Sequence, residues 1–511
     1  MNHSEKMKLF QEKKRHQLAM GGEEKLKARK EEGKLNARER IDCLFDPGTF
    51  MELGLFAHSA LPGMADRTPA DGKITGYGLV EGRPVGAVAN DMTVMGASSS
   101  LTNMKKIEHM RSISCEKGLP LVFLGESTGA RIPDVMGSQG MAQGGQNTEQ
   151  YRRLRESPWI SVLLGPSYGS STWYSAMSDI SIMLKGAVMA VSSPKVTSLA
   201  ISEELSPEEL GGWRLHSEVT GLVDAVGETE EECINTTKKY LSYLPSHAQE
   251  CPPQEEVPRE SGRDMPDILD ILPENPKRAY DMKNIVKTLV DGGQFLELKA
   301  HFGRPCITAF ARLDGHAVGI VANNPLFGAG ALDAECCEKI TSFLVLCDSF
   351  NIPIVTLVDT PGFLVGKEGE RRKITGKVIN WMNALSSVTV PKLTVVIRKS
   401  YGQAYLNMGG GKYSDVFVAW PTAEISFMGL EPAVNVVFGV KKEDDPEKFQ
   451  ELLSRMAKDT EPWGSAGIFG LNEIIDPADT RDFLIRMLDF HRNRRQGGLG
   501  RHLLRNWPTS Y

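Results

Sequence analysis

Apolar residues along this chain gather in short runs between turns, and their spacing changes from strand-like to helix-like in a fixed order. The runs Lys73–Val80 and Pro84–Asn90 favour strands, and the short segment Glu81–Arg83 between them predicts a hairpin. Apolar residues at every third position of Met104–Ile113 predict a helix with one buried face. A buried strand over Leu119–Leu124 and a glycine turn follow.

The same order of elements returns in the second half of the chain. Residues Ile74–Ile132 align without a gap with Ile307–Val365 at an offset of 233 positions, the offset that also separates Pro158 from Pro391 (391 − 158). Similarity over so long a stretch at one offset indicates a duplicated domain. Strands that alternate with helices predict βαβ crossovers, so the fold class that we expect is α/β, with two tandem copies of one domain.

The composition also suggests where these domains end. We expect an N-terminal domain over residues 1–245, a linker over 246–276 and a C-terminal domain over 277–511. Seven prolines lie between Pro245 and Pro276 among many acidic residues, which is typical of a stiff, exposed linker. Residues 4–42 favour helix with an interruption at Gly21–Gly22, so a solvated or dimer-embracing helical arm is expected over residues 1–45.

One short sequence follows a buried strand in both copies. Ser400–Ala404 (SYGQA) ends the apolar run Leu393–Ile397, and Ser167–Ser171 (SYGSS) has the same place in the first copy. A strand that runs into a glycine turn can direct backbone N–H groups at open space, where they can hold a developing negative charge. The sequence therefore predicts two oxyanion sites that are made by the main chain rather than by titrating side chains.

Charge and motifs argue against several other functions. A net charge of −6 is unsuited to general nucleic-acid binding, which needs a basic surface. No run is apolar enough for a membrane span, and the first residues look like neither a signal nor a transit peptide, so we expect a cytoplasmic protein. The eight cysteines include no CxxC pair, so we expect reduced structural thiols and no metal site.

One stretch looks like the nucleophile motif of serine hydrolases. Gly125–Gly129 (GESTG) matches GxSxG in letters. Pro133 follows, however, where the nucleophile elbow needs a continuing helix. We therefore do not expect Ser127 to act as a nucleophile.

A series of longer motifs extends through nearly the whole chain. They are Gly33–Ile41 (GKLNARERI), Leu44–Glu52, Asp91–Gly96, Gly129–Ile132, Ser206–Gly212, Asp359–Phe363, Arg398–Gly402 and Ala419–Ala423. Together they resemble the carboxyltransferase (β) subunits of biotin-dependent acyl-CoA carboxylases, of the propionyl-CoA carboxylase β type.

The resemblance implies crotonase-like domains, the first for acyl-CoA and the second for carboxybiotin, with each active site shared between two subunits of a homo-hexamer. It implies catalytic N–H pairs at Gly169 and Ser170 for the thioester enolate, and at Gln403 and Ala404 for the biotin ureido oxygen. The internal offset instead pairs Gln403 with Ser170, which leaves open that the first pair lies one residue later. The residues expected to contact the substrates are Gly129, Ala130, Arg131, Gly362, Phe363, Tyr401, Gly402 and Leu406.

The reaction that the resemblance implies moves a carboxyl group between carboxybiotin and the α-carbon of a short acyl-CoA, propionyl-CoA or acetyl-CoA, through an enolate. No Ala-Met-Lys-Met biotinylation motif occurs in the chain. Biotin is therefore expected on a partner protein, and the expected partners are a biotin carboxylase and a biotin carboxyl carrier subunit.

Three places depart from the family pattern. Ser170 and Gln403 stand where the family usually has glycine, and Ser127–Gly129 (STG) stands where it has Ser-Gly-Gly. Backbone donors survive these changes, but larger side chains narrow the pockets. Leu406 lies where the family selects the acyl chain, so the particular acyl-CoA stays open.

Three alternatives remain beside the leading prediction. A decarboxylase or transcarboxylase subunit of the methylmalonyl-CoA type would have the same two sites. A hydratase or isomerase of the same fold would need an acid–base pair beside Gly169, and none is evident. Ser170 and Gln403 also make a non-catalytic CoA-binding subunit conceivable.

Overall fold

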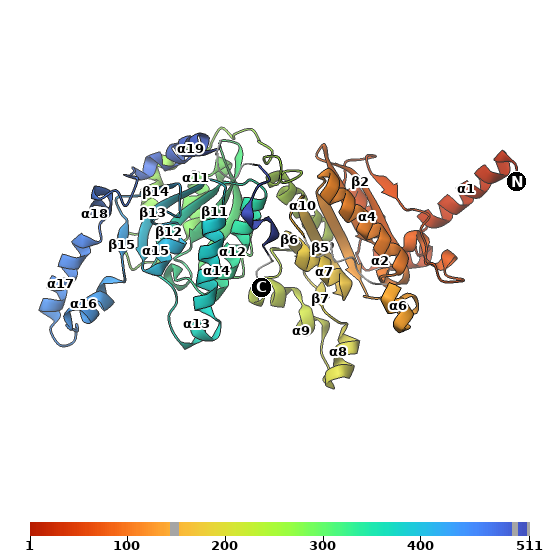
Figure 1. Ribbon diagram of the computed structural model, residues 1–511, viewed down its shortest axis with the longest axis horizontal. Coiled ribbons are helices and arrows are strands. Elements are labelled where there is room, and N and C mark those ends of the chain that lie inside the picture. Colours follow the sequence, from red (N-terminus) through yellow and green to blue (C-terminus); the bar gives the residue numbers. More distant parts are fainter. Residues whose placement is uncertain (144–152, 493–498, 508–511) are drawn as a thin grey trace. The chain divides into compact units, whose positions relative to one another are not determined.

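Each half of the chain folds around a sheet of its own (Figure 1). The computed structural model describes residues 1–143, 153–492 and 499–507. Two compact units divide between Glu250 and Cys251, a position inside the predicted linker. Both units combine helices with a sheet whose strands are mostly parallel, so the predicted α/β class is confirmed.

The first unit holds a sheet in the order β1-β2-β3-β4-β5-β6-β8, with β7 paired to β5. Its strands are β1 (Met51–Leu53), β2 (Lys73–Val80), β3 (Arg83–Asn90), β4 (Leu121–Ser127), β5 (Trp159–Tyr168), β6 (Ile180–Leu184), β7 (Val188–Ala190) and β8 (Ala225–Gly227). Its helices are α1 (His3–Leu18), α2 (Glu23–Glu31), α3 (Ala37–Leu44), α4 (Leu101–Lys117), α5 (Ile132–Val135), α6 (Gly137–Gln143), α7 (Ser170–Met177), α8 (Pro194–Ile201), α9 (Pro207–Gly211) and α10 (Glu230–Tyr243). Figure 1 shows α4 and α7 lying over the sheet.

The second unit repeats this plan with the order β16-β14-β13-β12-β11-β10-β9, and β15 pairs with β13. Its strands are β9 (Phe295–Leu298), β10 (Cys306–Leu313), β11 (His316–Asn323), β12 (Ile354–Thr360), β13 (Lys392–Tyr401), β14 (Val416–Ala419), β15 (Glu424–Ser426) and β16 (Glu473–Ile474). Its helices are α11 (Met282–Leu289), α12 (Ala334–Ser349), α13 (Lys367–Arg371), α14 (Ile374–Ser387), α15 (Gln403–Asn407), α16 (Leu430–Phe438), α17 (Pro446–Asp459), α18 (Pro462–Gly467) and α19 (Thr480–His491). In Figure 1, α16 and α17 project away from this sheet.

The two sheets share one register at the offset seen in the sequence. Ser127 lies opposite Ser167 beyond an irregularity in the β4–β5 pairing, and Thr360 lies opposite Ser400 beyond the same irregularity in β12–β13. A slip of one residue would turn every side chain to the other face of a sheet. Equal register therefore places corresponding residues of the two copies on corresponding faces.

The predicted hairpins form in both copies because their turn residues suit the required backbone. Glu81 and Gly82 have φ values of 50° and 78°, and Asp314 and Gly315 have φ values of 54° and 73°. Two successive residues with positive φ make the type I′ turn, which matches the twist of paired strands. The helices that follow bury their predicted apolar faces, as Met110 of α4 and Ile340 of α12 show with 1% exposure each.

The N-terminal arm is shorter than predicted. The expected break near Gly21 separates α1 from α2, but a second break precedes α3, where the Asn36 side chain accepts the N–H groups of Arg38 and Glu39. Such a cap starts a new helix instead of continuing the old one. Arg40 on α3 is fully buried, so residues 37–45 belong to the body of the first unit.

The predicted linker is also not exposed along its whole length. Met265 and Ile268 lie in a short 3₁₀ helix and are buried in the main apolar cluster of the second unit. This helix packs against α11, so the later part of the segment is part of a core.

Among the described residues, no helix is both long enough and apolar enough to cross a membrane.

Candidate functional site

The first candidate site forms where β5 turns into α7. Gly169 links the two elements with φ 64° and ψ −130°, a backbone conformation that favours glycine. Its N–H donates to the Val191 carbonyl oxygen at 3.2 Å. In the part of the chain that the structure describes, the next two N–H groups, of Ser170 and Ser171, have no hydrogen-bond partner. Donors in the first turn of a helix have no partner inside the helix, so this pair is open to a ligand.

The second candidate site repeats this geometry where β13 turns into α15. Gly402 has φ 60° and ψ −144°, and its N–H donates to the Ser426 carbonyl oxygen at 2.9 Å. The N–H groups of Gln403 and Ala404 follow, again without a partner among the described residues. The Gln403 side chain runs along α15, where its Nε2 donates to Oδ1 of Asn407 at 3.1 Å. The side-chain amide of Gln403 is therefore held by its own helix.

Equal geometry at Gly169 and Gly402 decides how the two sites correspond. Ser170 and Ser171 are the counterparts of Gln403 and Ala404. The prediction that Gly169 donates an N–H to the ligand is wrong, because a carbonyl from the segment after β7 already accepts it. Among the described residues, the open N–H groups of this turn are those of Ser170 and Ser171, the alternative that the internal offset leaves open. Ser170, Gln403 and Ala404 stay predictions as oxyanion donors.

A second loop reaches the first site from the end of β4. Gly129 comes close to the turn, since a Cβ added to Gly169 would lie 3.8 Å from the Gly129 Cα. The following residue, Ala130, is exposed, and its N–H has no partner among the residues that are described. Ala130 therefore offers a third open N–H group near Ser170. A φ of 97° explains why glycine stands at position 129.

The corresponding loop of the second site has the same internal bonds. The hydroxyls of Ser127 and Thr360 donate to the carbonyls of Ala97 and Gly330, at 3.0 and 2.8 Å. Each of these hydroxyls also accepts the N–H of the glycine two residues later, Gly129 or Gly362, at 3.2 Å. Phe363 takes the place of Ala130 beside Gly362. Because Ser127 is fully buried and serves as a turn residue, it cannot act as a hydrolase nucleophile.

Two of the predicted substrate contacts point into the protein instead. Arg131 is 2% exposed, and its Nη1 lies 2.5 Å from Oδ1 of Asp71. The hydroxyl of Tyr401 donates to Glu424 at 2.5 Å, and burial raises the pKa of this tyrosine well above its usual value. Neither polar group is free for a substrate, so these two predictions are wrong for the side chains. Leu406 is half-buried on α15, three residues beyond Gln403.

Sequence reasoning missed Ser99, which contacts the first site directly. Its Oγ lies 3.0 Å from Oγ of Ser170, although 71 positions separate the two residues. The duplication gave no signal for this contact, because Leu332 stands at the corresponding position of the second copy.

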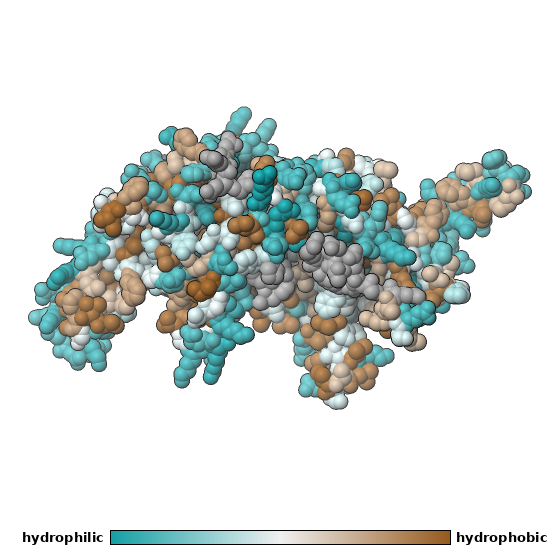
Figure 2. Space-filling view, viewed as in Figure 1, coloured by the Kyte–Doolittle hydropathy of each residue, from teal (hydrophilic) through white to brown (hydrophobic). Residues whose placement is uncertain are grey.

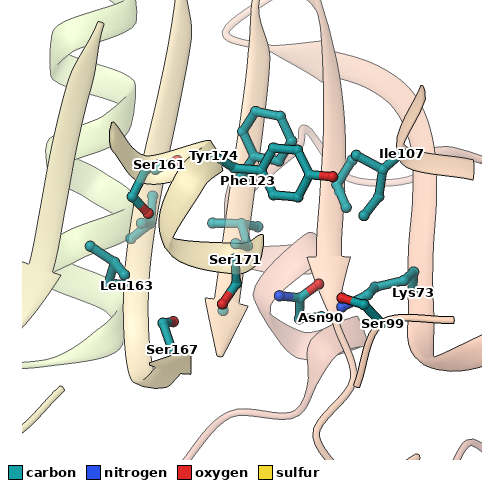
Figure 3. Close-up of a pocket in the computed structure, with 15 residues that line it drawn as sticks. Lys73, Asn90, Ser99, Ile107, Phe123, Ser161, Leu163, Ser167, Ser171 and Tyr174 are labelled. Atoms are coloured by element: carbon teal, nitrogen blue, oxygen red, sulfur yellow. The ribbon is translucent and has the colours of Figure 1, made fainter. Parts of the chain in front are cut away.

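A small cavity lies beside the first site (Figure 3). Its volume of about 30 Å³ is room for one water molecule. Figure 3 shows Asn90, Ser171, Ser99 and Lys73 together near one end of the cavity, with the rings of Phe123 and Tyr174 and the side chain of Ile107 toward the other. The polar end lies where β3 and β5 finish, next to the open N–H groups.

Lys73 is the charged group at the polar end of this cavity. It is 2% exposed, and its Nζ donates to the Ala97 carbonyl at 2.7 Å. Burial, followed by the nearby positive charge of Arg131, lowers the pKa of Lys73 to about 7. The Ala97 carbonyl also accepts the hydroxyl of Ser127, so Lys73 helps to hold the segment that contains Ala97.

We expect stability to depend on pH through Lys73. Between pH 7 and the unfolded pKa of 10.5, the unfolded chain holds a proton that the folded chain lacks, so stability rises with pH by about 1.4 kcal/mol per unit. Lys73→Met should remove the contribution of Lys73 and leave that of Lys106, whose pKa burial lowers to about 8. Lys185→Met, on the surface, should keep both contributions. Denaturant midpoints at pH 7.0 and 8.5 measure the slope. Equal slopes in wild type and Lys73→Met would contradict the assignment.

Two copies of an α/β domain, each with an open N–H pair after the same strand, define an enzyme class that holds oxyanions with its main chain. Residues 28–501 match the carboxyl transferase domain model, and the chain therefore belongs to the carboxyl transferase family. The resemblance drawn from the motifs is confirmed.

Three proteins that resemble this chain match it over almost its whole length. The carboxyltransferase subunit of propionyl-CoA carboxylase from Haloferax mediterranei is 36% identical over 500 residues, which is 95% of this chain and 96% of the relative. The methylmalonyl-CoA decarboxylase subunit alpha of Veillonella parvula is 35% identical over 96% of this chain and 97% of its own length. The crystal structure of the transcarboxylase 12S hexamer has a TM-score of 0.90 and 34% identity, and the match covers 97% of both chains.

Proposed function

We propose that this chain is a biotin-dependent acyl-CoA carboxyltransferase subunit, which moves a carboxyl group between carboxybiotin on a partner protein and the α-carbon of a short acyl-CoA. The observation that carries the proposal is the pair of equivalent sites, with open N–H groups at Ser170 and Ser171 in one unit and at Gln403 and Ala404 in the other. Two oxygen atoms gain negative charge in such a transfer, and each needs donors.

The first site suits the thioester oxygen. When the α-carbon of an acyl-CoA loses a proton or a carboxyl group, charge moves to the thioester oxygen as an enolate. The N–H groups of Ser170 and Ser171, with Ala130 beside them, would hold that charge. One such donor typically contributes on the order of 2.7–4 kcal/mol to transition-state stabilisation. Lys73 is not needed as a base, since its Nζ binds the Ala97 carbonyl.

The second site suits the ureido oxygen of biotin. Carboxybiotin supplies the carboxyl group when its carrier docks. Gln403 and Ala404 would donate to the ureido oxygen, whose negative charge grows as the carboxyl group leaves. The Gln403 side chain, held by Asn407, lines the site without closing it.

The surface of the chain supports assembly with other copies. Leu199 on α8 is 76% exposed, and Val436 and Val437 on α16 are 71% and 63% exposed. Figure 2 shows apolar side chains gathered at the tips of the projections that hold these helices. Exposed apolar patches mark interaction surfaces. We propose a homo-hexamer like the one named for transcarboxylase 12S, with a biotin carboxylase and a biotin carrier as further partners.

The direction of transfer and the acyl chain are part of the same proposal. Relatives are named as a propionyl-CoA carboxylase subunit and as a methylmalonyl-CoA decarboxylase subunit, and the two sites would serve both directions. We propose propionyl-CoA or acetyl-CoA as acceptor, with the methylmalonyl-CoA decarboxylase or transcarboxylase as the second candidate.

The test is carboxyl transfer by the purified chain in the reverse direction. Methylmalonyl-CoA or malonyl-CoA is incubated with free biotin, and the CoA products are separated by chromatography. We expect propionyl-CoA or acetyl-CoA to form only when both the chain and biotin are present. Binding of both thioesters without any turnover, even after a biotinylated carrier is added, would overturn the proposal in favour of a CoA-binding subunit.

A further inference from the structure

The first site contains a contact between two hydroxyls that the second site lacks. Oγ of Ser99 lies 3.0 Å from Oγ of Ser170, the first residue of α7. Ser99 is 7% exposed and belongs to the segment that precedes α4. This contact therefore ties the N-terminal turn of α7 to a different element, at the position of the first open N–H group.

The backbone of Ser99 is fixed on both sides by the loop that carries Ala130. Its N–H donates to the Gly129 carbonyl at 2.8 Å, and its own carbonyl accepts the N–H of Arg131 at 2.8 Å. These two bonds form a short parallel bridge between Ser99 and Ala130. Ser99 thus contacts both segments that would supply N–H donors to the thioester oxygen.

A buried ion pair holds this bridge from inside the unit. Arg131 bonds to Asp71 and, through Nη2, to the carbonyl of Ser98 at 3.2 Å. The Ser100 hydroxyl donates to the same aspartate. Arg131 and Asp71 are 2% and 0% exposed, so they are shielded from water and hold the segment on both sides of Ser99. A charged pair in such surroundings makes strong, directional bonds.

Neither the hydroxyl pair nor the arginine is repeated in the second unit. At the offset of 233, Leu332 replaces Ser99, Gln403 replaces Ser170 and Leu364 replaces Arg131. The main-chain bridge itself remains there, between Leu332 and Phe363. The hydroxyl contact is thus an addition to the first site rather than a requirement of the fold.

We propose that Ser99 is a positioning residue for the first site, which acts through the hydroxyl of Ser170 to hold the N-terminal turn of α7 against the Ala130 loop. The inference rests on the proposed function, because it concerns how the thioester oxygen is held. Donors aimed at developing charge contribute most when their positions are fixed before the reaction. A small displacement of such a group can cost up to about a hundredfold in rate.

The same helix offers a matched control at its other end. Oγ of Ser178, the residue that caps the C-terminus of α7, lies 2.8 Å from Oγ of Ser161 on β5. Ser178→Ala removes this buried hydroxyl contact, together with the bond that the Ser178 hydroxyl donates to the Tyr174 carbonyl at 2.8 Å, at the end of α7 away from the open N–H groups. It reports the effect of loosening α7 in general.

The experiment compares Ser99→Ala with Ser178→Ala in the full chain, using transfer from methylmalonyl-CoA or malonyl-CoA to free biotin. We expect Ser99→Ala to lower kcat about tenfold, with the KM for biotin unchanged, and Ser178→Ala to keep the wild-type kcat. Melting temperatures should fall by similar amounts in the two variants. An active wild type with equal kcat in both variants would overturn the role of Ser99, whereas an inactive wild type would overturn the proposed function instead.

A double variant tests whether Ser99 acts through Ser170. Ser170→Ala alone should lower kcat by about the same factor as Ser99→Ala, and the two changes together should lower it no further. Residues that act as one unit are non-additive in this way. Losses that multiply in the double variant would contradict positioning through the Ser170 hydroxyl.

Discussion

Gln403→Pro should lower the rate of carboxyl transfer by roughly 10²–10³-fold, because proline has no N–H to give to the biotin ureido oxygen. Gln403→Gly should keep most of the activity, since it removes only a side chain that contacts Asn407. Turnover with saturating biotin and thioester, measured for wild type and both variants, checks the expectation.

The structure predicts that Gln403→Pro leaves the fold of α15 intact. Gln403 is the first residue of α15, where proline is well tolerated because that N–H has no partner within a helix. We therefore expect the melting temperature of Gln403→Pro to stay close to that of Gln403→Gly. Equal activity losses in the two variants, with unchanged melting, would refute the assignment of Gln403 to the biotin site.

Ser170→Pro should have an effect of the same size, roughly 10²–10³-fold, on the thioester side. Ser170 is the first residue of α7, and its N–H is open like that of Gln403. The substitution also removes the hydroxyl that contacts Ser99, so Ser170→Ala is the control that loses the hydroxyl and keeps the N–H. The additional loss in the proline variant isolates the N–H.

Gly169→Pro should contrast with Ser170→Pro in its effect on stability. Gly169 has positive φ and donates to Val191, so Gly169→Pro should damage folding first and lower the melting temperature. Ser170→Pro should instead keep its melting temperature and lose activity. A Ser170→Pro variant that transfers carboxyl groups as fast as Ser170→Ala would show that the first donor pair lies elsewhere.

The duplication could be predicted from the sequence because both copies show the same local patterns of turn residues and apolar spacing. The hairpin at Glu81–Arg83 and the helix face around Met110 depend on turn chemistry and on spacing, and both copies repeat them. Residues 233 positions apart also correspond in the structure. They share the same strand register, and a glycine precedes both α7 and α15. Two independent copies made these predictions stronger than one copy would.

The predictions that were wrong concern residues whose contacts come from distant segments of the chain. Whether the Gly169 N–H is open depends on Val191, and whether Arg131 reaches a substrate depends on Asp71, 60 positions earlier. Tyr401 is a predicted substrate contact, but Glu424 accepts its hydroxyl. The N-terminal arm was too long because a cap at Asn36 and burial of Arg40 outweigh helix propensity. Spacing along the chain contains no information on such partners.

We propose that two main-chain N–H pairs, one in each unit, hold the two oxygens of a carboxyl transfer. The most direct measurement follows an isotopic label in the carboxyl group of methylmalonyl-CoA or malonyl-CoA into biotin, with wild type, Gln403→Pro, Ser170→Pro and the matched Gln403→Gly and Ser170→Ala variants. We predict that wild type transfers the label, that both proline variants transfer it roughly 10²–10³-fold more slowly, and that each matched variant retains more activity than its proline counterpart. Transfer at the wild-type rate by both proline variants would show that these N–H groups do not hold the two oxygens, and no label in biotin with wild type would refute carboxyl transfer itself.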